Sequence, residues 1–262
     1  WHEVVRQLSA DFRVVAYDVR GAGDSFRPHR REDYALSQLT ADFQVVLDAV
    51  SPDRPVHLVG HDWGSVQGWE FVTEPGLKGR IASFTSCSGP CLDHMGFWVR
   101  EQFRHPSPRG LLQIGVQTLK SWYVYFFHLP VLPEALWRHV LGRHWPALMR
   151  RLEGIQNVPD HPAMQAADGQ HGVWLYRANF LPRLMHPRER FAHAPVQVLV
   201  PTGDHFVSPA LSADLGRWVP QLTRRELAAG HWVPLEQPGL FAQAVREYVT
   251  SISPAPQAAS FL

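Results

Sequence analysis

Apolar residues along the chain follow two alternating patterns: short runs, and stretches in which they recur every three or four positions. The runs predict strands at 12–19, 56–60, 80–89, 195–201 and 222–228. The helical spacing predicts helices at 1–10, 37–50, 65–74, 209–219 and 238–252. Strands that alternate with helices indicate an α/β fold with a doubly wound, mostly parallel sheet. Within it, the run 56–60 is typical of a strand buried on both faces.

The alternation stops between Pro90 and about Phe191. This stretch is rich in aromatic residues, prolines and histidines, and its pattern predicts helices rather than strands. Open α/β sheets bind ligands at the carboxyl ends of their strands, so we expect a helical insertion over that edge. The predicted organisation is a core of 1–90 and 191–252, a helical cap of 91–190, and a tail or linker of 253–262.

Composition narrows the class of protein. The chain has 262 residues, 45% hydrophobic and 19% charged, with a net charge of +1, and no basic block dense enough for nucleic acid. Cys87 and Cys91 are expected to be buried thiols rather than metal ligands. The glycine turn at 21–23 lacks the third glycine of a dinucleotide-binding fingerprint. With no signal peptide and no run long enough to span a bilayer, the sequence predicts a cytoplasmic globular protein.

One short motif points to catalysis. "GHDWGS", residues 60–65, directly follows the predicted strand 56–60. Its G-x-D-x-G spacing is that of a nucleophile elbow, with aspartate where most such elbows have serine. Gly60 and Gly64 would let chain segments pass closely at the turn. The alternative for Asp62 is an aspartate that caps the following helix.

Four motifs together make the chain resemble the α/β-hydrolase fold family, and within it the epoxide hydrolases. They are "DVRGAGDS" (18–25), "GHDWGS" (60–65), "TGDHFVSP" (202–209) and "GHWVPLEQP" (230–238). The chain is similar to the hydrolase domains that some bacteria fuse to a C-terminal short-chain dehydrogenase. The resemblance covers nearly the whole chain. It implies hydrolysis of a small apolar epoxide to a vicinal diol, with no cofactor or metal.

The resemblance also implies a catalytic triad. Asp62, Asp204 and His231 occur in the nucleophile–acid–histidine order of the fold. Asp204 would orient His231 and stabilise its protonated ring, although a turn aspartate is the alternative. Asp62 would form an alkyl ester, which water activated by His231 would hydrolyse. The backbone N–H of Trp63 would be one donor to the oxyanion.

Two tyrosines in the predicted cap favour epoxide chemistry. Tyr123 in "WYVYFFHLP" and Tyr176 in "VWLYRANF" have contexts similar to the two lid tyrosines of epoxide hydrolases. Their O–H groups would stabilise the alkoxide that develops as the epoxide opens. Aromatic packing is the alternative role for both, and Tyr125 is the main rival candidate.

The chain departs from the family at its start. The second oxyanion donor of the family belongs to a His-Gly-x-Pro loop, which would lie just before Trp1. The pair His171–Gly172 does not match, because Val173 and Trp174 follow it. We therefore expect an N-terminally truncated chain, and the activity of such a fragment stays open.

Three other functions also stay open. One is a haloalkane dehalogenase, in which Trp63 and either Trp122 or Trp174 would hold the halide. Another is a different C–X or ester hydrolase of the same fold. The third is a non-catalytic scaffold domain, against which the complete Asp–Asp–His set argues. Ten tryptophans and fourteen phenylalanines favour a bulky apolar epoxide such as a lipid, although much of this aromatic content belongs to the core.

Overall fold

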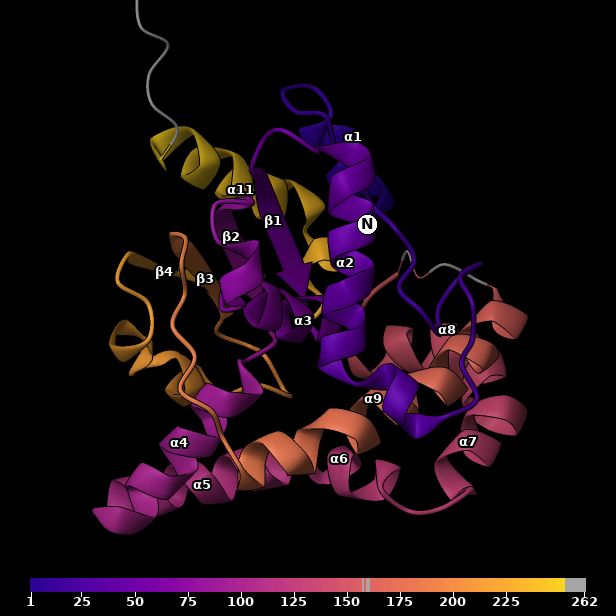
Figure 1. The fold of residues 1–262 in the computed structure, drawn as a ribbon. Coiled ribbons are helices and arrows are strands. Elements are labelled where there is room, and N and C mark those ends of the chain that lie inside the picture. The colour runs from indigo at the N-terminus through magenta and orange to yellow at the C-terminus, as the bar shows by residue number, and fades with distance from the viewer. Residues whose placement is uncertain (157, 159–160, 253–262) are drawn as a thin grey trace, which may run out of the picture.

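The computed structural model describes residues 1–156, 158 and 161–252, so the predicted tail at 253–262 lies outside the described residues. A four-stranded sheet with the order β1-β2-β3-β4 forms its centre (Figure 1). Its strands are β1 (Val56–His61), β2 (Ile81–Cys87), β3 (Val196–Pro201) and β4 (Leu222–Leu227). All three ladders are parallel, which confirms the predicted parallel sheet.

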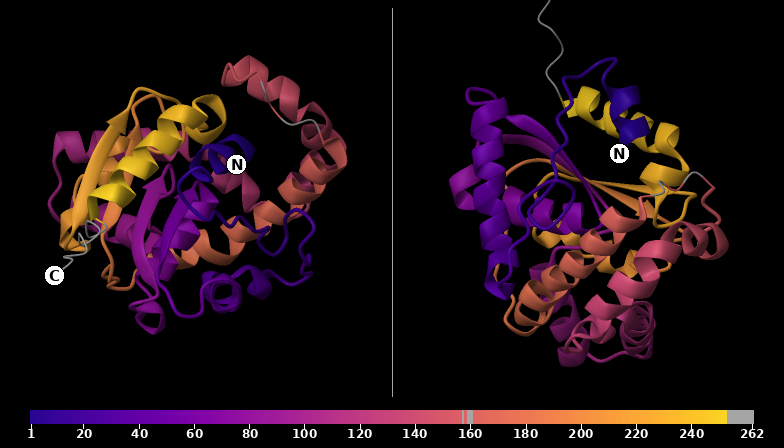
Figure 2. Two further views of the ribbon diagram at one scale, coloured as in Figure 1. Left: turned by 90° about the horizontal axis from the view of Figure 1, so that it is seen from above. Right: turned by 90° about the vertical axis from the view of Figure 1, so that its right-hand side faces the viewer.

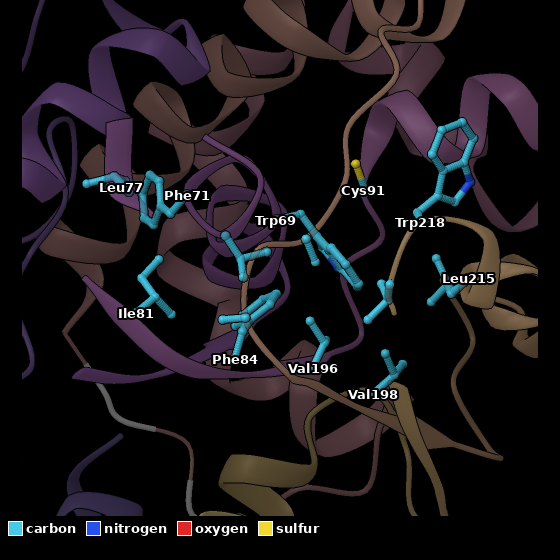
Figure 3. Packing of buried hydrophobic residues seen from close by; sticks show 14 of the residues in the cluster. Trp69, Phe71, Leu77, Ile81, Phe84, Cys91, Val196, Val198, Leu215 and Trp218 are labelled. Carbon is cyan, nitrogen blue, oxygen red and sulfur yellow. The ribbon is translucent and has the colours of Figure 1, made fainter. Parts of the chain in front are cut away.

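Helices pack on both faces of the sheet, as a doubly wound fold requires. One face is covered by α2 (Leu36–Val50) and α3 (Trp63–Val72), the other by α1 (His2–Leu8) and α11 (Pro238–Ile252) (Figure 2). Alternate side chains of β3 serve the two faces: Val196 and Val198 join the first cluster, and Leu199 joins the second. In Figure 3, Trp69 lies against Phe84 in the first cluster, and their ring centroids are 5.4 Å apart.

A layer of helices lies beyond the carboxyl ends of the strands, below the sheet in Figure 1. It consists of α4 (Leu92–Arg104), α5 (Pro108–Lys120), α6 (Trp122–Phe127), α7 (Leu132–Leu136), α8 (Gly142–Leu152) and α9 (Pro162–Met185). A π-helical turn, Trp137–Leu141, joins α7 to α8. We call this set the helical layer. No helix of the described residues has the length and apolarity that a membrane crossing requires.

The remaining elements are short. α10 (Val233–Glu236) precedes α11, and 3-10 turns occur at Arg31–Tyr34, Pro75–Leu77, Pro209–Ser212 and Leu215–Arg217.

Apolar packing and ion pairs fix the helical layer to the core. One cluster joins the two parts through Tyr34, Leu36, Leu39, Val66, Leu92 and Leu175. Arg188, just after α9, contacts Asp93 of α4 at 2.7 Å and Glu70 of α3 at 2.8 Å. Both carboxylates are buried, so each needs a cation: Asp93 has Arg188, and Glu70 has Arg188 and, at 3.3 Å, Arg190. Arg188 thereby ties the beginning and the end of the helical layer to α3.

Three sequence expectations are wrong in the described chain. Residues 12–19 form no strand: the segment joins no ladder, and Val15 and Tyr17 are exposed. A strand needs a neighbour to satisfy its backbone groups, and none of the described strands pairs with it. The helix expected at 209–219 is two separate 3-10 turns, because Gly216 is a poor helix former. β1 lies at the sheet edge and is only partly buried.

Candidate active site

The turn from β1 into α3 has the geometry of an elbow. Asp62 at its tip has φ 51°, a value that L-residues seldom adopt. A Cβ added to Gly60 would lie 2.5 Å from the Gly64 carbonyl oxygen, which accounts for the glycine at position 60. Gly64 has no such constraint, because a Cβ there would meet nothing within 4 Å. Instead Gly89, after β2, approaches the elbow: its added Cβ would lie 2.1 Å from the Asp62 carbonyl oxygen.

The side chain of Asp62 is not a helix cap. Although the residue precedes α3 directly, its carboxyl forms no capping hydrogen bond. It borders the cavity beneath the helical layer instead. Burial raises the pKa of Asp62, while the charge of His231 and the backbone N–H of Trp63 act to lower that pKa. The Trp63 amide therefore lies close to this carboxyl group.

Asp204 and His231 form a buried pair. His231 Nδ1 lies 3.1 Å from Asp204 Oδ2 and 3.2 Å from Oδ1. Asp204 Oδ1 also accepts hydrogen bonds from the N–H groups of Phe206, at 2.7 Å, and Val207, at 2.9 Å. Asp204 is thus a turn aspartate and the partner of the histidine at once. The turn holds its carboxylate in place, and that carboxylate orients the ring of His231.

Asp204 and His231 each stabilise the charged form of the other. Burial acts to lower the pKa of His231, but the hydrogen bond and charge of Asp204 outweigh it, so that pKa is raised. Burial acts to raise the pKa of Asp204, but His231 and the two turn amides keep it below its ordinary value. An imidazolium at His231 is therefore stabilised next to an ionised Asp204.

The imidazole of His231 lies between the two carboxyl groups. Its Nε2 is 4.0 Å from Asp62 Oδ1, on the side opposite Asp204. Three residues that are far apart in the sequence thus meet at the carboxyl edge of the parallel sheet, where the chain order predicts them.

Two tyrosines face Asp62 from the helical layer. Tyr123 of α6 and Tyr176 of α9 line the same cavity as Asp62, and their ring centroids are 5.8 Å apart. Each phenol also affects the pKa of the other, because the two rings pack edge-on against each other. Burial raises the pKa of both tyrosines, and the negative charge of Asp62 raises it further, so both stay protonated O–H donors. The rival Tyr125 is 52% exposed and does not line the cavity.

The cavity is mostly apolar. Its apolar lining includes Val66, Leu92, Met95, Phe180, Val207 and Leu211, and Gln117 and Ser121 add polar groups. Trp63 lines it, whereas Trp122 is exposed and Trp174 stacks on Tyr34. His171 is also outside it, because its Nδ1 is 2.6 Å from the Tyr34 hydroxyl.

Two residues at the site were not singled out from the sequence. Phe206 packs edge-on against Tyr123, at 5.5 Å between centroids, and against His231, at 4.8 Å. His61 Nε2 donates a hydrogen bond of 2.7 Å to the His231 carbonyl oxygen. Burial lowers the pKa of His61 to about 3, so this ring is neutral. Both lie inside the quoted motifs, but motif spacing does not show which side chain contacts which.

Fold and site together define an α/β hydrolase with an aspartate elbow. A family model described as "alpha/beta hydrolase fold" matches residues 1–238, and the chain belongs to this family. Among curated relatives, it is similar to "Epoxide hydrolase 3" of Xenopus tropicalis, 28% identical over 265 residues, which cover 95% of this chain and 67% of that protein. It is also similar to "Probable oxidoreductase EphD" of Mycobacterium tuberculosis, 38% identical over 255 residues.

The match to EphD covers 95% of this chain but only 43% of that protein, so the chain spans less than half of the length of this relative. Among solved structures, the fold is similar to that of an epoxide hydrolase from Bacillus megaterium in complex with an inhibitor. The TM-score is 0.75 at 21% identity, over 96% of this chain and 87% of that one. The predicted fold and the resemblance to epoxide hydrolases are thereby confirmed.

Proposed function

We propose that this protein is an epoxide hydrolase that opens an apolar epoxide to a vicinal diol through an ester on Asp62. The observation that carries the proposal is that one cavity is lined by both a carboxylate nucleophile and phenolic O–H donors. Asp62 lies on the side of the sheet, and the paired hydroxyls of Tyr123 and Tyr176 lie on the side of the helical layer. An epoxide needs both, because a nucleophile attacks its carbon while a donor stabilises its oxygen.

In the first step a carboxylate oxygen of Asp62 attacks a ring carbon of the epoxide. The C–O bond of the ring breaks, and its electron pair stays on the oxygen as an alkoxide. Tyr123 and Tyr176 hydrogen-bond to this alkoxide, and one of the two phenols donates its proton to it, leaving a phenolate. Neither phenol needs to ionise beforehand, which agrees with the raised pKa of both tyrosines.

In the second step His231 removes a proton from water, and the resulting hydroxide attacks the carboxyl carbon of Asp62. The Trp63 N–H stabilises the oxyanion. Asp204 stabilises the imidazolium, in keeping with the raised pKa of His231. The bond from the carboxyl carbon to the alkyl oxygen then breaks, and the imidazolium gives its proton to the leaving alkoxide, which completes the diol. The Asp62 carboxyl group loses the proton that came with the hydroxide, and this proton restores the phenol that was ionised in the first step. One carboxylate oxygen of Asp62 leaves in the product and is replaced by the oxygen of water.

Haloalkane dehalogenation fits this cavity less well. It requires N–H donors for a halide, and neither Trp122 nor Trp174 lines the cavity together with Trp63. The oxidoreductase name of EphD is not transferred either, because it belongs to a protein of which the chain matches only 43%. The mostly apolar lining supports a lipid-derived or other apolar epoxide as the substrate.

The covalent step can be tested with His231→Gln. This variant keeps the nucleophile but loses the base, so it should form the ester and fail to hydrolyse it. Intact-mass measurement after mixing with styrene oxide should show one added substrate mass, and peptide mapping should place it on Asp62. His171→Gln is the matched control: it removes a histidine outside the cavity and should turn over without accumulating ester. An unmodified mass for His231→Gln, where the wild type turns over, would contradict covalent catalysis.

A further inference from the structure

Helix α5 has its apolar and polar faces inverted relative to an ordinary surface helix. The residues that it buries are Gly110 and Gln117. Its outward residues include Leu112 and Leu119, which are 67% and 75% exposed. A surface helix normally turns its leucines toward the core and its glutamines toward water, so this arrangement calls for a partner surface.

The exposed apolar side chains continue onto the neighbouring helices. We define the apolar face as Phe103, Leu111, Leu112, Val116, Leu119 and Trp122, from α4, α5 and α6. These three helices follow one another along the lower edge of the molecule in Figure 1. Leu112, Val116 and Leu119 are spaced by four and three residues, which places them on one side of α5.

Positive charge lies next to the apolar face and continues along the helical layer. Residues 100–152 contain eight lysines and arginines against two glutamates, a net charge of +6 in a chain whose total is +1. Seven of the eight are exposed arginines. Arg100, Arg104 and Arg109 lie on α4 and α5, beside the apolar face, and the other four lie further along the layer, at positions 138, 143, 150 and 151. None of the seven forms an ion pair with a described residue, whereas Arg20, Arg80 and Arg188 elsewhere all do. These guanidinium groups are therefore available to an external anion.

The same helices border the candidate active site from their inner side. Gln117 of α5 and Tyr123 of α6 line the cavity above Asp62, while Leu119 and Trp122 point outward. A single helix, about 10 Å across with its side chains, therefore separates the apolar face from the cavity.

From these observations we infer that the apolar face is a docking site for the surface of an anionic lipid bilayer. The leucines and Trp122 enter the boundary between headgroups and acyl chains, and Arg100, Arg104 and Arg109 contact the lipid phosphates. Charge favours this occupant over a second copy of the chain, since a symmetric dimer through the apolar face would bring Arg100, Arg104 and Arg109 of both copies together. The docking itself does not depend on the proposed reaction, but it would place the cavity next to an apolar substrate in the bilayer.

Vesicle flotation tests the charge requirement. The wild-type protein should float with vesicles of equal parts phosphatidylcholine and phosphatidylglycerol, and bind phosphatidylcholine vesicles at least tenfold more weakly. Raising the salt concentration from about 0.05 M to about 0.5 M should release it, because screening shortens the reach of the arginines. Arg104→Glu with Arg109→Glu should lower the partition coefficient at least tenfold. Arg31→Glu with Arg54→Glu, a matched pair of exposed arginines outside the helical layer, should lower it less than threefold.

A second variant tests whether the exposed leucines of the apolar face are needed for binding to vesicles. Leu112→Ser with Leu119→Ser should lower binding at least tenfold without lowering thermal stability, because both side chains are exposed in the free protein. Val45→Ser, at a valine of α2 that is 69% exposed, is the control and should bind like the wild type. Equal binding to both vesicle types, or equal losses for Val45→Ser, would overturn the inference. So would a dimer of the wild type, seen by ultracentrifugation, that the two serines dissociate, because the face would then belong to a second copy.

Discussion

The Nε2 atom of His231 lies 4.0 Å from Oδ1 of Asp62, beyond hydrogen-bonding distance. The histidine is thus not positioned to take a proton from this carboxyl group, and a carboxylate nucleophile needs no such base. A water molecule can contact both atoms from the cavity side at about 2.8 Å each. The separation suits a histidine that acts only in the second step, on water that attacks the ester.

Because Asp62 acts in ester formation and His231 in ester hydrolysis, the two steps should depend differently on pH. Ester hydrolysis needs a neutral His231, whose pKa is raised above its ordinary 6.5 by Asp204. Hydrolysis should therefore decline as the pH falls through that raised value. Ester formation needs only an ionised Asp62: burial raises the pKa of this carboxyl group, and the imidazolium 4.0 Å away acts to lower it. It should persist to lower pH, so that the wild type accumulates ester in mildly acidic solution.

Rapid-quench mass measurements across the pH range separate the two steps. The ester fraction of the wild type should rise as the pH decreases and fall again once Asp62 becomes protonated. If formation and hydrolysis lost their rates at the same pH, His231 would not be the base of a separate second step.

Much of the candidate site could be predicted from the sequence because it depends on chain order. Asp62, Asp204 and His231 each follow a predicted strand, and the carboxyl ends of parallel strands meet at one edge of the sheet. Tyr123 and Tyr176 came from a resemblance of short contexts rather than from periodicity. Their placement in the cavity agrees with that resemblance, and their roles in the reaction stay proposals.

Other features depend on contacts that no local pattern specifies. Gly89 is separated from Asp62 by a whole helix and strand, so its contact with the elbow is visible only in three dimensions. The apolar run at 12–19 has the composition of a strand, but a strand also requires a neighbour for its backbone hydrogen bonds. Hydrophobic spacing likewise places the leucines of α5 on one side without showing that this side faces outward.

Gly89 offers a direct test of the elbow. In Gly89→Ala the new methyl group would lie 2.1 Å from the Asp62 carbonyl oxygen and 2.8 Å from Ser65 Cβ, so the elbow must shift. Such overpacking typically costs about 1–3 kcal/mol of stability. A displacement of the nucleophile by about 1 Å can lower the rate on the order of 10²-fold.

Gly64→Ala is the matched control within the same elbow. Its methyl group would meet nothing within 4 Å, and alanine is better than glycine in a helix by about 1 kcal/mol. Thermal unfolding and steady-state rates should therefore show a loss for position 89 and none for position 64. Equal effects would mean that the contact with the Asp62 carbonyl does not hold the elbow.

Arg188 is expected to stabilise the attachment of the helical layer. Arg188→Met would leave Asp93 and Glu70, which are 2% and 6% exposed, without their closest cation. Breaking a buried pair from one side typically costs about 3–5 kcal/mol. Arg183→Met is the control, since Arg183 has no ion pair among the described residues, and its free energy of unfolding should stay within about 0.5 kcal/mol of wild type. Chemical denaturation of the three proteins measures the difference, and similar values for both variants would contradict this role.

The two tyrosines should act on ester formation alone. Loss of one preorganised donor typically lowers a rate by about 10²–10³-fold. Tyr123→Phe should slow formation of the ester by that order, and Tyr176→Phe should have a similar or milder effect because one hydroxyl remains. The rate of ester hydrolysis should change little, because the alkoxide has been protonated by then.

Single-turnover measurements with an epoxide distinguish these rates, and Tyr125→Phe provides the control. Tyr125 is 52% exposed and outside the cavity, so its variant should form ester at the wild-type rate. The double variant of Tyr123 and Tyr176 should be slower than either single one, but by less than the product of the two effects, because the two rings are in contact and serve the same oxygen atom. A double variant that opened epoxides at the wild-type rate would remove the reason for preferring epoxide chemistry, and haloalkanes would become the substrates to test next.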